Sequence, residues 1–108
     1  MIPNWLSKRL KDSPTPLRER LEEIVGGLDP GADFAAALLE AACTLLEQVR
    51  ARLEHREAAF DLLVADGLLT LVCEAAVFAE PDTLVERCQA MGPDGELGRV
   101  AARWAGRG

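Results

Sequence analysis

Residues 58–79 read AAFDLLVADGLLTLVCEAAVFA, and this stretch decides the fold that we expect for the chain. Apolar residues fall on nearly every side of a helix here. The stretch also contains carboxylates, and each carboxylate at the centre of a membrane span costs about 3 kcal/mol of insertion free energy. A helix that is hydrophobic all round is central in its bundle or buried in an oligomer. We therefore predict a buried helix over 58–79, and not a membrane span. The interrupting residues are Asp61, Asp66, Gly67, Thr70 and Glu74.

The preceding segment, residues 33–53, carries apolar residues at intervals of three and four, which predicts an amphipathic helix with Asp33 as its N-cap. Between the two segments lies the polar interval 53–57, which contains neither Gly nor Pro. We predict a tight reversal there, so that the two long helices form an antiparallel hairpin. One continuous helix over 33–79 would be about 70 Å long at 1.5 Å per residue. Only an elongated dimer could cover that length, and this alternative stays open.

Turn-forming residues punctuate the rest of the chain, at 26–31, 80–82 and 92–95, and no stretch alternates with the period of a strand. We therefore predict a single all-α domain over 1–108, a small bundle of about five helices built around the long hairpin. Asp82 is the expected N-cap of the helix over 83–91. A short N-terminal helix is expected over 3–10, and five further helices are expected over 16–25, 33–53, 58–79, 83–91 and 96–105.

Composition excludes several classes of protein. The chain has 108 residues and a net charge of −6, with 49% hydrophobic residues, which is too apolar for a disordered segment and too acidic for a nucleic-acid-binding domain. Its N-terminus lacks the charge-then-apolar order of a secretory signal. An odd number of cysteines without a CxxC pair indicates buried free thiols in a cytoplasmic protein. These cysteines are Cys43, Cys73 and Cys88.

The apolar surface of residues 58–79 exceeds what so short a chain can cover, which favours a homodimer, with another protein as a further possible partner. We expect a non-catalytic interaction module, such as an adaptor, an assembly factor or a small regulatory subunit, with no cofactor. The candidate interaction residues are Trp5, Leu6, Phe60, Leu68, Leu69, Leu71, Val72, Phe78, Arg99, Arg103 and Trp104.

Two basic segments leave alternatives open. Arginines 99, 103 and 107 repeat every four residues beside Trp104, and they can meet an acidic partner or the acidic middle of this same chain. The N-terminal segment around Trp5 is amphipathic and basic, and it can dock on its own bundle, on a partner or on a membrane surface. We favour internal pairing for the first segment and core docking for the second.

The alternative function is a small-ligand or metal-binding bundle. A spacing of four places Asp66, Thr70 and Glu74 on one helix face, and Glu40 and Glu47 form a similar strip on the preceding helix. Facing helices that carry carboxylates can hold a metal ion, but such sites also use a Glu-x-x-His pair that this chain lacks. Solvated faces explain the same strips. An enzyme is a third reading, with the pKa of Asp66 or Glu74 raised by burial.

Overall fold

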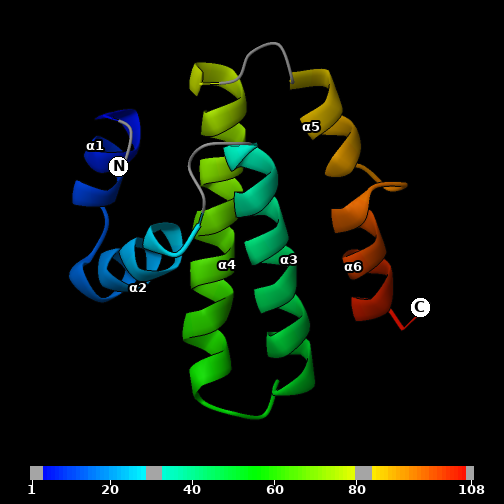
Figure 1. The fold of residues 1–108 in the computed structure, drawn as a ribbon. Helices are drawn as coiled ribbons and strands as arrows, with labels where there is room; N and C mark the ends of the chain where they lie inside the picture. The colour runs from blue at the N-terminus through cyan, green and yellow to red at the C-terminus, as the bar shows by residue number, and fades with distance from the viewer. Residues whose placement is uncertain (1–3, 29–32, 80–83, 107–108) are drawn as a thin grey trace.

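The computed structural model describes residues 4–28, 33–79 and 84–106, and within these ranges every regular element is a helix (Figure 1). The predicted all-α class is confirmed. No helix within the described ranges is long and apolar enough to cross a membrane. The elements are α1 (Asn4–Lys11), α2 (Thr15–Gly26), α3 (Phe34–Ala51), α4 (Glu57–Glu74), the π-helical turn η1 (Ala75–Ala79), α5 (Leu84–Ala90) and α6 (Glu96–Trp104).

Helices α3 and α4 lie side by side along their length, and a turn over residues 52–56 joins them (Figure 1). Asp33 caps α3 as expected, because its Oδ1 accepts a hydrogen bond from the backbone N–H of Ala36 at 3.1 Å. Arg52 tethers the turn to α4 through an ion pair with Asp61, with 2.9 Å between Nη2 and Oδ2. The chain therefore reverses in the polar interval, and it does not continue as one helix.

The core lies between α3 and α4, and α1 and α2 extend it on one side of α4. Gly67 is the contact point between α4 and α2, because a Cβ built there would lie 3.3 Å from Cδ1 of Leu21. A close approach at this glycine follows from its missing side chain. Helix α2 begins at Thr15 directly after Pro14, and no side chain caps it.

Helix α4 is covered on one side only. Leu68 and Val72 are fully buried, whereas Leu62 and Leu63 are 44% and 50% exposed. The α-helix ends at Glu74, and residues 75–79 continue as the π-helical turn instead of completing a helix to 79. The described helices therefore leave one side of α4 uncovered, and an apolar strip stays at the surface.

The C-terminal pair, α5 and α6, is joined by a tight turn, and α6 packs against α3. Gly98 makes this junction possible, because a Cβ there would overlap the backbone carbonyl oxygens of Gly92 and Pro93. The predicted helix over 83–91 corresponds to α5. The predicted cap, Asp82, lies outside the described residues.

The cysteines differ from expectation. Cys43 is buried, whereas Cys73 and Cys88 are exposed, so the prediction of three buried thiols was wrong for two of them. Cys73 lies on the uncovered side of α4, which explains its exposure. Burial, assisted by the charge of Glu96, raises the pKa of the Cys43 thiol to about 11.

Candidate interaction groove

The structure separates the predicted interaction residues into core and surface. Four of them are at most 2% exposed, so they hold the folded chain together and present nothing to a partner: Leu6, Leu68, Leu71 and Val72. Phe60 and Trp104 are 38% and 36% exposed, and Leu69 and Trp5 are half-buried. The side chain of Phe78 lies outside the described part of the structure.

Two adjoining hollows form a groove: one lies along α4 beside Leu46 of α3, and the other lies between α4 and α6 over the surface of α3. One hollow has a volume of about 450 Å³ and the other about 250 Å³. Leu46 and Leu62 line both hollows, so the groove is continuous. We call it the α3–α4–α6 groove. Its remaining lining residues are Ala59, Leu63, Asp66, Leu69, Leu97, Val100, Ala101 and Trp104.

Sequence reasoning identified only part of this groove. It found Leu69 and Trp104 as interaction residues, but it missed Leu46, Leu62 and Leu63. The last two occur in an unbroken apolar run, where nothing in the sequence shows which residue is covered. The recurrence of leucines along residues 33–53 predicted Leu46 as a core residue. In the structure Leu46 is half-buried and lines a hollow together with residues of α6.

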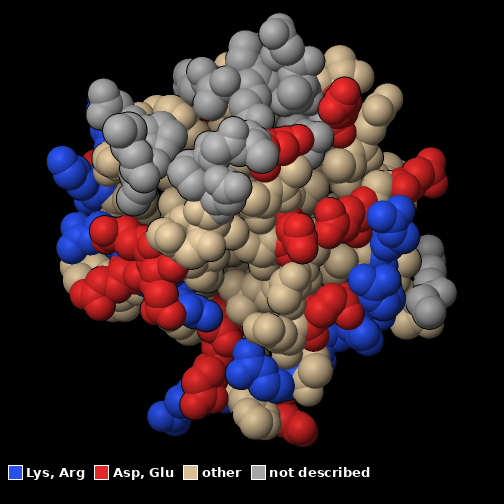
Figure 2. All heavy atoms as spheres, viewed as in Figure 1, with Lys and Arg blue, Asp and Glu red and all other residues tan. Residues whose placement is uncertain are grey.

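Of the described residues that line the groove, Asp66 alone is charged. Its backbone carbonyl accepts the hydroxyl of Thr70 at 3.1 Å, and its carboxylate forms no ion pair with any described residue. Most arginines elsewhere are already engaged by carboxylates. On the face shown in Figure 2, acidic and basic side chains lie next to one another at several places. The engaged arginines are Arg9, Arg18, Arg20, Arg50, Arg52 and Arg103.

The expected internal pairing of the basic row is present at Arg103. Its Nε donates to Oε1 of Glu47 at 3.0 Å, and Arg50 donates to the other carboxylate oxygen at 3.2 Å. The hydrogen bond from Arg103, followed by that from Arg50, lowers the pKa of Glu47. Arg99 instead donates to the backbone carbonyl of Asp94 at 3.2 Å. Arg107 lies outside the described residues.

The residues of the alternative ligand or metal site do not converge. Glu47 is held by two arginines, Glu74 pairs with Arg9, and Asp66 faces the apolar groove. Glu40 lines neither hollow of the groove, and the Thr70 hydroxyl is used within its own helix. Within the described ranges, no three His, Cys, Asp or Glu side chains are grouped so that they could hold a metal ion. Within the described residues, the two strips therefore do not form the shared carboxylate site on which the alternative function depends.

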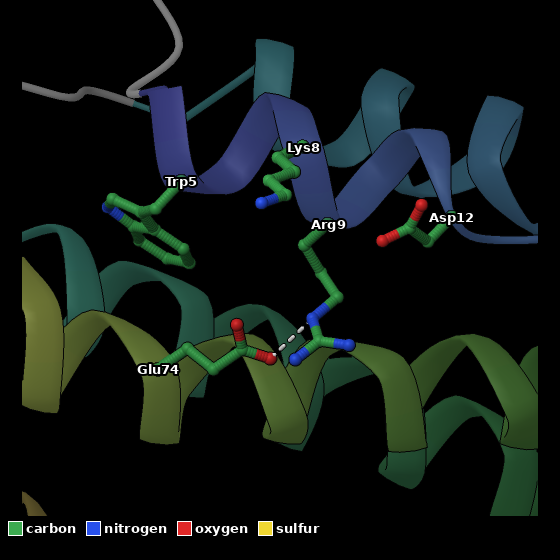
Figure 3. Close-up of a pocket in the computed structure, with 5 residues that line it drawn as sticks. All are labelled: Trp5, Lys8, Arg9, Asp12 and Glu74. Carbon is green, nitrogen blue, oxygen red and sulfur yellow. Dashed lines mark ion pairs between the residues drawn. The ribbon is translucent and has the colours of Figure 1, made fainter.

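A separate hollow of about 510 Å³ lies between α1 and the end of α4 (Figure 3). Its lining residues are Trp5, Lys8, Arg9, Asp12 and Glu74. Arg9 reaches from α1 to Glu74, with 2.8 Å between Nε and Oε1. Leu6 and Leu10 are buried beneath the same helix, at 0% and 3% exposure. The N-terminal amphipathic segment is thus docked on its own bundle.

Comparisons with protein-family models, with curated proteins and with solved structures gave no match to this chain.

Proposed function

We propose that this chain is a non-catalytic protein-interaction module whose α3–α4–α6 groove binds an amphipathic helix of another polypeptide. The observation that carries the proposal is the continuity of the groove. Two hollows share Leu46 and Leu62, and the described residues that line them are apolar except for Asp66. A contiguous exposed apolar surface with so little polar lining is typical of docking sites.

A helix is the occupant that suits this shape. The floor is supplied by α3 and the walls by α4 and α6, and helices pack by inserting side-chain ridges into such grooves. Hollows in series accept successive anchors at i, i+3 or i+4, and i+7 of a bound helix. The chain contains its own example of this mode, because α1 buries Leu6 and Leu10 on the bundle at a spacing of four.

Homodimerisation through the same surface stays a prediction, and charge argues against it as the main occupancy. A symmetric contact uses the same patch twice, so it would bring two Asp66 carboxylates into one apolar interface. Among the described residues that line the groove, none is cationic. A different polypeptide is free of this constraint and can supply the missing cation.

A selection from a displayed library of helical peptides tests the proposal. We expect the wild-type protein to enrich amphipathic sequences that compete with one another. Leu63→Lys places a cation on the groove wall and should abolish their binding, and the folding of this variant is checked by circular dichroism. Leu53→Lys is the matched control, because Leu53 is 59% exposed and does not line the groove. Its binding should equal that of wild type.

Failure to enrich such peptides, or equal binding by both lysine variants, would contradict the proposed function. Analytical ultracentrifugation of the protein alone tests the other occupant. A dimer that Leu63→Lys dissociates and Leu53→Lys leaves intact would assign the groove to a second copy and would also overturn the proposal.

A further inference from the structure

We infer that the helix bound in the α3–α4–α6 groove carries a lysine or arginine that pairs with Asp66. This inference rests on the proposed function and names the chemistry of the partner: a basic amphipathic helix, in which one cation projects beside the apolar anchors.

The position of Asp66 carries the inference. Its neighbours in the first hollow are apolar, including Leu62, Leu63 and Leu69, and its carboxylate has no ion-pair partner among the described residues. It is exposed while the groove is empty. A helix laid over these leucines removes water from the carboxylate, and a covered charge without a partner is strongly unfavourable. A cation on the incoming helix replaces the lost hydration with a charge-assisted hydrogen bond.

The chain already docks one of its own helices through an ion pair beside buried leucines. Near the end of α4, α1 contributes two buried leucines together with Arg9, which meets Glu74 at 2.8 Å (Figure 3). The side chain of Glu74 is only 15% exposed, so its carboxylate is largely shielded from water, and Arg9 balances its charge. Asp66 offers a second carboxylate on α4, beside an apolar groove that none of the described helices fills.

The charge also determines which helices are rejected. A helix with an acidic residue at this position would place two carboxylates together in an apolar contact, and a neutral residue would leave Asp66 uncompensated. Asp66 therefore selects among amphipathic helices that fit the hollows equally well, because it makes the binding of acidic or neutral helices unfavourable.

The peptide selection described above is extended to test this inference. We expect the enriched sequences to carry Lys or Arg at one fixed position relative to their apolar anchors. The best peptide should bind Asp66→Asn about tenfold more weakly than wild type, the size expected for loss of a charge-assisted contact. Selection against Asp66→Lys should replace the cation with Asp or Glu. Glu40→Gln is the control, because it removes an exposed carboxylate that does not line the groove.

The outcomes separate the two proposals. If Leu63→Lys abolishes binding while the enriched peptides show no preferred charge, or while Asp66→Asn binds like Glu40→Gln, the inference about the cation is overturned and the groove stands. If no enriched peptide depends on Leu63, both proposals fail. Asp66 is exposed on its helix, so these substitutions leave the core intact, and circular dichroism spectra verify this.

Discussion

Truncation of two leucines five residues apart on α4 distinguishes the covered side of this helix from the open side. Leu68 is fully buried, and Leu68→Ala removes three carbon atoms from the core. At about 0.8 kcal/mol per buried carbon, with a further contribution from the cavity left behind, the free energy of unfolding should fall by about 3 kcal/mol. Leu63 is 50% exposed, so Leu63→Ala loses roughly half the transfer term and leaves no closed cavity; we expect about 1 kcal/mol.

Urea unfolding followed by circular dichroism measures both changes. With a slope of about 1.5 kcal/mol per molar urea, the two midpoints should differ by about 1.3 M. If Leu68→Ala does not fold, Leu68→Val, which removes one carbon, replaces it with an expected loss of about 1 kcal/mol. Equal losses for the two alanine variants would refute the assigned orientation of α4. A loss at Leu63 that grows with protein concentration would instead show that a second copy covers it.

Three other predictions concern single groups. Gly98→Ala should destabilise the protein and lower its Tm in differential scanning calorimetry, because the new Cβ overlaps backbone carbonyl oxygens at the α5–α6 junction. Arg103→Gln should raise the pKa of Glu47 in a carboxyl NMR titration, and an unchanged pKa would show that the contact is absent in solution. Because folding lowers the pKa of Glu47, the pair stabilises the folded protein at pH values above the pKa of the unfolded state. This stabilisation is lost as the pH falls through the pKa of the folded state. With a disulfide reagent at pH 8, two thiols should react quickly and Cys43 slowly, and three equal rates would contradict its burial.

The fold was predictable where local chemistry is sufficient. Each of three features is encoded by a few neighbouring residues: the cap at Asp33, the leucine spacing of α3 and the polar turn at 52–56. The orientation of α4 was not predictable in this way, because its apolar residues surround the whole helix. Its covered side is set by distant contacts, such as the seat of Leu21 against Gly67.

The candidate site depended still more on distant contacts. Glu74 and Glu47 looked alike in the sequence, as acids on the strips of two helices, and each is neutralised by an arginine from a helix far along the chain. Asp66 has no such neighbour among the described residues. It lines a hollow whose other described residues are apolar and include Leu46 from α3, a neighbour that no periodicity in residues 58–79 can indicate.

Mapping amide chemical shifts in ¹⁵N–¹H spectra, while the best selected peptide is titrated into the labelled protein, tests the role of the groove most directly. If the groove is the docking site, we expect the largest shifts in residues 59–69 of α4 and 97–104 of α6. Leu53 and Val85 should be unaffected although both are exposed. Shifts concentrated on α1 and α2, or at the turn over residues 52–56, would place the docking surface elsewhere and contradict it.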